Sequence, residues 1–220
     1  MKLFWAALSG VLCTAHISFA EPRVTYNAYG MPGLVDMPSA QSAPDAELSF
    51  SVSQSGKSLR NTLTFQIAPR LTGAFRYSSI ERPTQTLYDR SFDLRYRLLD
   101  ETQLRPAVAV GLQDFIGTGV YSGEYVAASK TFGPVVATAG IGWGRLGSHN
   151  SFDNPLGLIS SRFDTRDAGF TGTGGRIESA RWFRGPAAFF AGFAWPVTDK
   201  VTLKAEYSSD AYTGSCCRPF

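Results

Sequence analysis

The feature that most constrains how this chain can fold is a period of two in its apolar residues. From residue 46 onward, Leu48, Phe50 and Val52 alternate with serines, and the same alternation returns many times toward the C-terminus. Successive side chains of a strand point to opposite faces, so this period gathers the apolar residues on one face. An amphipathic helix would instead repeat them every three to four positions. The pattern therefore predicts an all-β chain.

Turn-forming residues separate the alternating segments. Gly56-Lys57, Pro69-Arg70 and Gly133-Pro134 each stand between two of them, and such pairs favour tight turns. Because these connections are short, we expect consecutive strands to pair antiparallel in an up-and-down order. Pro196 to Asp199 is expected to join the last two strands. We count about nine candidate strands, whose alternating positions include residues 48–53, 62–67, 73–78, 92–98, 108–113, 124–132, 135–143, 187–195 and 201–208.

Three features favour a membrane barrel. The strands have roughly 9–11 residues, which is enough to cross a bilayer when tilted. Short and long connections are mixed, as in barrels with periplasmic turns and longer outer loops. Aromatic residues near strand ends are typical of interfacial girdles; they are Tyr77, Tyr88, Tyr121, Tyr125, Trp143, Trp195 and Tyr207. We predict an antiparallel up-and-down transmembrane β-barrel, or a partial barrel, of about 8–10 strands. The alternative is a soluble periplasmic sheet whose apolar face is a protein core.

Charged residues predict that the other face of the sheet meets water. Asp93, Arg95 and Arg97 occupy alternate positions of one strand, and charges are costly in apolar surroundings. Cations on this face are candidates to line a polar lumen and to attract an anionic glycan. They are Arg60, Arg76, Arg95, Arg97 and Lys130. The competing interpretation is that they form ordinary ion pairs with Asp93 or Glu124.

Residues 1–20 have the pattern of a cleavable signal peptide. Lys2 supplies the positive charge, and Leu3 to Val11 is an apolar run of roughly ten residues, too short to be a transmembrane helix. Small residues at the −3 and −1 positions predict cleavage after Ala20 and therefore export. Lipidation at Cys13 is the alternative, which the bulky leucine before it disfavours.

The mature chain divides into regions of different character. Residues 21–45 are rich in Pro, Gly and Ser and are expected to form an irregular leader. Residues 46–212 form the predicted barrel region. Within it, residues 145–186 show no period and are expected to be a long loop, either extracellular or folded into the lumen, with short helical turns in places. Residues 213–220 are an atypical C-terminal tail.

Composition excludes several classes of protein. The formal charge of +3, from 21 Lys and Arg against 18 Asp and Glu, gives no reason to expect nucleic-acid binding. The adjacent Cys216 and Cys217 imply no disulfide framework, and no cysteine spacing suggests a metal site. No apolar run of about 20 residues follows the N-terminal segment, which excludes a helical membrane protein.

Enzymatic chemistry has little support. His149 stands near Ser148, Asn150 and Asp153 and so offers parts of a hydrolase, but sequence neighbours do not establish a base within reach of a nucleophile. The run from Gly172 to Gly175 lacks the Lys-Ser/Thr of a phosphate-binding loop. We therefore expect a protein that is not an enzyme and needs no cofactor.

Three successive stretches resemble the YjbH family of exopolysaccharide-biosynthesis outer-membrane proteins. They are Arg105 to Gly119 (RPAVAVGLQDFIGTG), Tyr121 to Lys130 (YSGEYVAASK) and Gly140 to Gly147 (GIGWGRLG). Similar elements occur at Asn27 to Gly33, Trp182 to Gly185 and Leu203 to Tyr212, so the resemblance spans nearly all of the mature chain.

The resemblance implies an outer-membrane β-barrel protein that assists the synthesis or export of capsule or exopolysaccharide. Its implied partners are outer-membrane lipid, the polymer and other export proteins, and it carries over no catalytic residue. A general porin is the alternative. The motif glycines Gly111, Gly117 and Gly119 permit turns or close backbone approach. Asp114, Glu124 and Lys130 are expected to form a polar cluster near that turn, as a structural corner or a glycan contact.

The chain departs from the family at its C-terminus. Family members continue with further strands, whereas this chain ends in Gly214 to Phe220. A terminal phenylalanine is typical of outer-membrane barrels, but Pro219 cannot donate to a strand ladder. We therefore expect a truncated or frameshifted fragment with unpaired strand edges.

Overall fold

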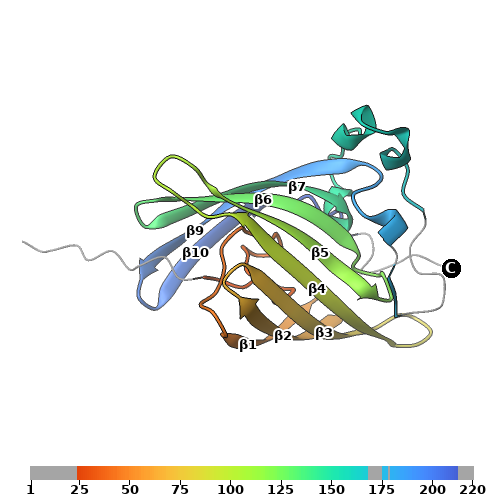
Figure 1. The fold of residues 1–220 in the computed structure, drawn as a ribbon. Coiled ribbons are helices and arrows are strands. Elements are labelled where there is room, and N and C mark those ends of the chain that lie inside the picture. The colour runs from red at the N-terminus through yellow and green to blue at the C-terminus, as the bar shows by residue number, and fades with distance from the viewer. Residues whose placement is uncertain (1–23, 168–174, 178, 213–220) are drawn as a thin grey trace, which may run out of the picture.

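Nine strands form one antiparallel sheet in chain order in a computed structural model that describes residues 24–167, 175–177 and 179–212 (Figure 1). They are β1 (Leu48–Ser55), β2 (Ser58–Ala68), β3 (Leu71–Ile80), β4 (Leu87–Leu99), β5 (Ala107–Gly117), β6 (Gly123–Phe132), β7 (Val135–Gly144), β9 (Ala187–Thr198) and β10 (Val201–Tyr207). A two-residue strand, β8 (Arg176–Ile177), pairs with β5. The predicted all-β class and antiparallel order are confirmed. The predicted signal peptide, the C-terminal tail and most of the run from Gly172 to Gly175 lie outside the described residues.

The sheet curves into a half-barrel (Figure 1). Strands β1 and β10 form its two edges, and within the described ranges neither pairs with the other. The predicted turns at residues 56–57, 69–70 and 133–134 all lie between paired strands.

The last predicted turn was wrong in its position. Pro196 and Val197 belong to β9, and the chain turns at residues 199–200. A register shift between Val201 and Thr202 gives β9 an extra residue there. The last residue of β9 that pairs with β7 is Ala194. Pro196 lies beyond that pairing, so no carbonyl of β7 is left without a hydrogen bond by the amide hydrogen that proline lacks.

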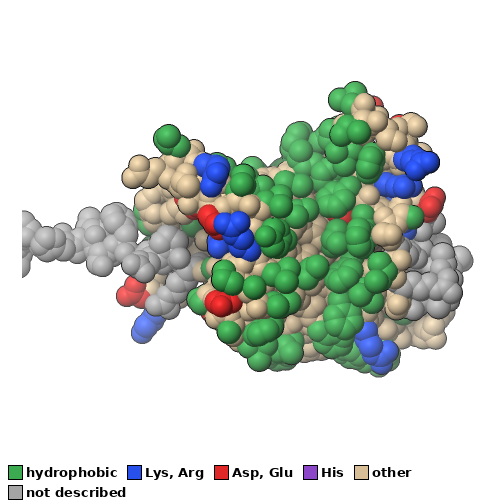
Figure 2. All heavy atoms as spheres, viewed as in Figure 1, with side chains coloured by type: hydrophobic (Ala, Val, Ile, Leu, Met, Phe, Trp, Pro, Cys, Tyr) green, Lys and Arg blue, Asp and Glu red, His purple; other side chains and the backbone are tan. Residues whose placement is uncertain are grey.

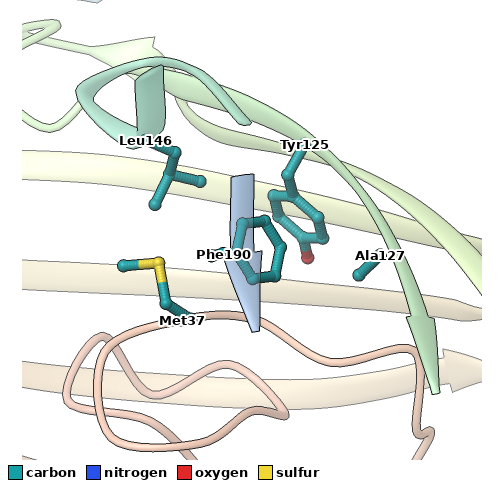
Figure 3. Close-up of a cluster of buried hydrophobic side chains, with 5 residues drawn as sticks. All are labelled: Met37, Tyr125, Ala127, Leu146 and Phe190. Atoms are coloured by element: carbon teal, nitrogen blue, oxygen red, sulfur yellow. The ribbon is translucent and has the colours of Figure 1, made fainter. Parts of the chain in front are cut away.

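Residues 24–47, which we call the leader, cross the concave face of the half-barrel. Met37 of the leader packs against sheet residues and the first turn of the long loop, in a cluster completed by Tyr125, Ala127, Leu146 and Phe190 (Figure 3). Ala40 packs in the same way against Ala107 and Ala109. The small buried core thus lies between the leader and the concave face.

The two faces of the sheet have inverted polarity. Large apolar side chains cover the convex face, as Figure 2 shows for one side of the molecule; among the most exposed are Leu48, Phe50, Val52, Leu63, Phe65, Ile67, Phe92, Phe132, Phe189 and Leu203. The concave face carries polar and charged side chains, and these are buried: Arg76, Arg95 and Asp93 are 0%, 1% and 2% exposed. The expectation that this charged face meets water was therefore wrong, because the leader covers it.

The long loop covers the convex side at one rim. It contains the 3-10 turns η1 (Arg145–Gly147), η2 (Pro155–Leu158), η3 (Ser161–Phe163) and η4 (Ser179–Arg181), together with β8. The Phe152 ring stacks on Phe189 of the convex face with centroids 4.6 Å apart. The first turn of this loop, η1, points inward, because Leu146 packs in the concave core with Met37. From Phe152 onward, the described parts lie on the convex side of the rim or project from it (Figure 1).

The aromatic girdle is only partly as expected. Tyr88, Trp195 and Tyr207 are exposed, and Tyr77 stacks against Tyr88. Three other members are buried, so they cannot contact a lipid interface; they are Tyr121, Tyr125 and Trp143.

Candidate functional site: the concave face and its leader

Edge strand β10 binds the leader through one carboxylate. Glu206 accepts hydrogen bonds from three consecutive leader amides, at 2.9 Å from Val35, 3.0 Å from Asp36 and 3.1 Å from Met37. A carboxylate that accepts several amides forms charge-assisted bonds, which are stronger than neutral ones. Glu206 therefore holds the middle of the leader on the open edge of the sheet.

Lys204, two residues before Glu206 on the same face of β10, binds carbonyl oxygens of the leader. The Lys204 ammonium donates to the carbonyls of Tyr26 at 3.0 Å and Leu34 at 2.8 Å. Residues i and i+2 of a strand share a face, so Lys204 and Glu206 together bind both polar groups of the leader backbone. Figure 1 shows β10 beside the leader.

Two buried arginines hold the leader from the centre of the sheet. Arg76 on β3 donates to the Tyr29 carbonyl at 3.1 Å and pairs with Asp93 on β4 at 2.8 and 3.0 Å. Arg95 on β4 donates to the Ser39 carbonyl at 3.0 Å. Leader carbonyls and a carboxylate thus replace water as hydrogen-bond acceptors for these guanidinium groups. Buried charges need such partners to offset the loss of hydration.

Tyr29 is the most enclosed aromatic side chain of the leader. The guanidinium carbons of Arg145 and Arg60 lie 4.0 and 4.4 Å from its ring centroid, and Tyr121 meets it edge to face at 5.5 Å. Contacts of this kind between cations and aromatic rings are attractive, the more so when water is excluded. Burial raises the pKa of the Tyr29 phenol, although the two arginines oppose that shift.

Asp114 reaches the concave face through a bulge in β5. Leu112 pairs with Leu94 and Ile116 with Phe92, so the residues between 112 and 116 loop out of the ladder. Asp114 has a left-handed φ of 50°. Its amide donates to Asp93 at 2.8 Å, and its carboxylate accepts from the Tyr121 amide at 2.9 Å. This bulge is the predicted corner, and of the three residues predicted to cluster there Asp114 is the one that lies in it.

The motif glycines are explained by close contacts around that corner. A Cβ on Gly111 would lie 2.3 Å from the Tyr125 ring, and one on Gly117 would lie 2.1 Å from the Asp114 carboxylate and 2.7 Å from the Arg90 carbonyl. Gly119 has a left-handed φ of 77° in the β5–β6 turn. All three therefore have a structural reason to be glycine.

The predicted cluster of Asp114, Glu124 and Lys130 does not come together. Glu124 pairs directly with Leu112 and Trp143 across the sheet, which places it on the convex side beneath the long loop. There it pairs with Arg166 and accepts from the Phe183 amide at 3.0 Å.

Lys130 and Arg97 lie at the opposite end of the strands, near the β4–β5 turn. Lys130 pairs with Glu101 at 3.2 Å, and Arg97 pairs with Asp100 at 3.1 Å. Partial burial opposes ionisation of Glu101, but hydrogen bonds from Thr131 and Lys130 hold its pKa below the usual range. Of the predicted glycan contacts, Arg76, Arg95 and Asp114 therefore share the buried concave face, and Arg97, Lys130 and Glu124 lie outside that buried group.

His149 is exposed and contacts Asn150 at 3.2 Å. The Ser148 hydroxyl donates to the Arg145 carbonyl and accepts from the Ala211 amide. Across the described ranges, no three His, Cys, Asp or Glu side chains are grouped to hold a metal ion. No helix within those ranges is long and apolar enough to span a membrane.

Sequence reasoning missed the residues that bind the leader and the loop. Lys204 and Glu206 gave a usable signal, since two opposite charges at i and i+2 on a predicted strand mark one polar face. Arg166, which ties the loop to Glu124, gave none, because residues 145–186 have no period that relates them to the sheet. The arrangement as a whole holds an irregular, turn-rich leader on the concave face and excludes water from the charges beneath it.

Comparison with known proteins adds a family relationship. Residues 25–216 match the family described as exopolysaccharide biosynthesis protein YbjH. The chain is also 35% identical over 195 residues to a protein of Escherichia coli strain K12 called uncharacterized lipoprotein YjbH. That similarity covers 84% of this chain, whereas the chain spans 28% of the length of that relative. No solved structure matches the chain.

Proposed function

The chain belongs to the YjbH family of exopolysaccharide biosynthesis proteins, and from that premise we propose that it forms part of an outer-membrane β-barrel that assists production or export of exopolysaccharide or capsule. It catalyses no step of its own in this proposal. Its partners are outer-membrane lipid, the polymer and other export proteins, and a signal peptide cleaved after Ala20 directs it out of the cytoplasm.

The observation that carries the membrane part of the proposal is the inverted polarity of the sheet. Phe50, Phe132 and Phe189 are 68%, 62% and 58% exposed on the convex face, while arginines and aspartates are buried on the concave face. A soluble sheet would bury its aromatic side chains and expose its charges. Strands β2 to β7 and β9 have 10 to 13 residues, enough to cross a bilayer when tilted, which needs about 9–11 residues.

Loop lengths support an orientation. One end of the sheet carries only the connections 69–70, 100–106, 133–134 and 199–200, and the other end carries the long loop, residues 145–186. Membrane barrels have short periplasmic turns and longer extracellular loops. In the proposal, the long loop therefore lies at the cell surface, and the leader enters from the periplasmic end, where β1 begins.

The packed concave face argues against the alternative of a general diffusion porin. A porin keeps a water-filled lumen, whereas the leader covers the cations that would line it here. Arg76 and Arg95 are committed to leader carbonyls, and Arg76 also to Asp93. We therefore propose that this part of the protein forms a section of barrel wall whose inner face is covered by the leader, and that polymer does not pass along that face.

The test is deletion of the gene in a strain that produces the polymer. Cell-surface polysaccharide should fall, and the wild-type gene should restore it. Density-gradient fractionation should find the protein with outer-membrane markers. A matched complementing variant, Lys57→Ala in the exposed β1–β2 turn, should restore polymer fully. Unchanged polymer after deletion would contradict the polysaccharide role, and a soluble periplasmic protein would contradict the barrel.

A further inference from the structure

The tip of the long loop is a rigid platform. Asn154 makes four hydrogen bonds that hold it: its carbonyl oxygen accepts from the Trp143 indole and the Leu156 amide, each at 3.0 Å, and its side-chain nitrogen donates to the carbonyls of Phe163 and Phe183, each at 2.8 Å. One buried side chain thus ties η2, η3 and the returning chain to β7.

This platform continues the convex apolar face. Phe152 exchanges backbone hydrogen bonds with Ala187 at 2.8 and 3.0 Å, and its ring stacks on Phe189. Phe189 is itself 58% exposed. The loop therefore begins on the face that the proposed function assigns to lipid, and Figure 2 shows hydrophobic side chains both on that face and on the projecting loop.

Two large aliphatic side chains stand at the outermost point of the platform. Leu158 and Ile159 are 95% and 78% exposed. Two adjacent apolar side chains that face water forgo the hydrophobic stabilisation that burial would give them. Arg162, also exposed, follows within the next turn. An apolar tip beside a cation is the chemistry of a segment that lies in a lipid interface.

We propose that residues 152–163 form an interfacial anchor. Leu158 and Ile159 enter the boundary between head groups and acyl chains of the lipid that surrounds the sheet, and Arg162 meets anionic head groups. This inference rests on the proposed membrane location. Lipid is the occupant because Phe152 and Phe189 make the tip continuous with the convex face, and because the part of the loop that carries Leu158 and Ile159 projects outward from the rim (Figure 1).

Fluorophore labelling at single cysteines tests the anchor. The full chain is refolded into vesicles of phosphatidylethanolamine and phosphatidylglycerol that contain a nitroxide lipid, with a nitrobenzoxadiazole label on Ile159→Cys. Phe193→Cys, on the convex face of β9, reports insertion of the sheet. Lys57→Cys is the aqueous control, because Lys57 lies in an exposed turn at the end of the sheet that also carries the long loop. The native cysteines are replaced by serine in every variant: Cys13, Cys216 and Cys217.

The anchor predicts that the label at Ile159 shifts its emission to the blue and is quenched by the nitroxide lipid, comparably to Phe193 and unlike Lys57. Quenching at Phe193 without quenching at Ile159 would overturn the anchor and leave the membrane barrel standing. A blue shift at Ile159 without lipid quenching would mean that the tip packs on protein, which also overturns it. No quenching at either position would reject the proposed membrane location together with the anchor.

Discussion

The guanidinium of Arg76 and the carboxylate of Asp93 form a two-point ion pair beneath the leader, with nitrogen to oxygen distances of 2.8 and 3.0 Å. Both side chains are almost fully buried, at 0% and 1% exposed. The same arginine donates to the leader at Tyr29 and the same aspartate accepts from β5 at Asp114. This pair therefore links the leader to three strands.

Breaking this pair should destabilise the fold strongly. Asp93→Asn leaves a buried guanidinium without its counter-charge, which typically costs about 3–5 kcal/mol. The measurement is the free energy of unfolding in urea of the protein refolded in detergent micelles. Asp100→Asn removes the partner of two solvent-accessible pairs, with Arg70 and with Arg97, and each should contribute about 1 kcal/mol or less. Equal effects of the two variants would show that the buried pair has no special role.

Removing the carboxylate of Glu206 should loosen the leader while leaving the sheet paired. Glu206→Ala deprives three exposed or partly buried amides of their acceptor, and water can replace that acceptor in part, so the loss should be below the roughly 1–3 kcal/mol of a buried unmet donor. Hydrogen exchange at Val35, Asp36 and Met37 should accelerate, with little change in β3 and β4. Glu81→Ala, at an exposed position, is the control. Unchanged exchange in the leader would show that β10 does not hold it.

Alanine should be tolerated poorly at Gly117 and better at Gly73. The Cβ at Gly117 would lie 2.7 Å from the Arg90 carbonyl oxygen and 3.0 Å from the Ser91 Cα. Both are backbone atoms of a paired strand, which cannot shift as a flexible side chain can. Overpacking of this kind typically costs about 1–3 kcal/mol. At Gly73 the contact is the flexible end of the exposed Ile67 side chain, at 2.9 Å. Melting temperatures of the two variants give the comparison, and a similar loss at both would contradict the steric reason.

Arg166→Ala should release the long loop from the rim. Arg166 pairs with Glu124 and donates to the Ser122 hydroxyl and the Arg181 carbonyl, so its loss also leaves a buried carboxylate with fewer partners. Proteinase K should cut within residues 145–186 faster than in the parent protein. Ser151→Ala, at an exposed position of the same loop and outside the proposed anchor, should leave the cutting rate unchanged. Equal cutting rates in both variants would show that the pair between Arg166 and Glu124 does not hold the loop on the rim.

The mature protein should begin at Glu21. Mass spectrometry of protein purified from membranes should give the unmodified mass of a chain that starts there, because the residues at −3 and −1 suit signal peptidase. The relative in Escherichia coli is called a lipoprotein, so the informative alternative is a chain that starts at a lipidated Cys13. Cys13→Ser separates the two outcomes, since it should leave the mass of the mature protein unaltered if cleavage follows Ala20.

Strand order and turn positions were predictable because they depend on local patterns. The alternation of Phe92 and Leu94 with Asp93 and Arg95 defines β4 without any knowledge of its neighbours, and Gly133 marks a turn that only a few residue types favour. Pro196 misled this reasoning. A proline can lie inside a strand when a bulge on one side and the end of the neighbouring strand on the other remove the need for its amide, and neither is visible from local sequence.

The coverage of the two faces was not predictable in the same way. Trp143 and Glu124 belong by alternation to the convex face, and they are buried because a loop returns over them. Tyr121 and Tyr125 likewise stand near strand ends but are enclosed, so they contribute nothing to an interfacial girdle. Period assigns a side chain to a face, and only the path of distant chain segments decides whether that face is covered.

The sequence by itself determined that the chain is a meander of antiparallel strands with one apolar and one charged face, because side-chain direction in a strand follows from local backbone geometry. Only the tertiary structure decided that the leader fills the charged face, that Arg76 pairs with Asp93, and that Glu124 pairs with Arg166 across the rim. These contacts join residues far apart along the chain, such as Val35 and Glu206. The leader contacts use backbone groups that every residue carries, and the two ion pairs join charged side chains whose partners alternation alone does not select.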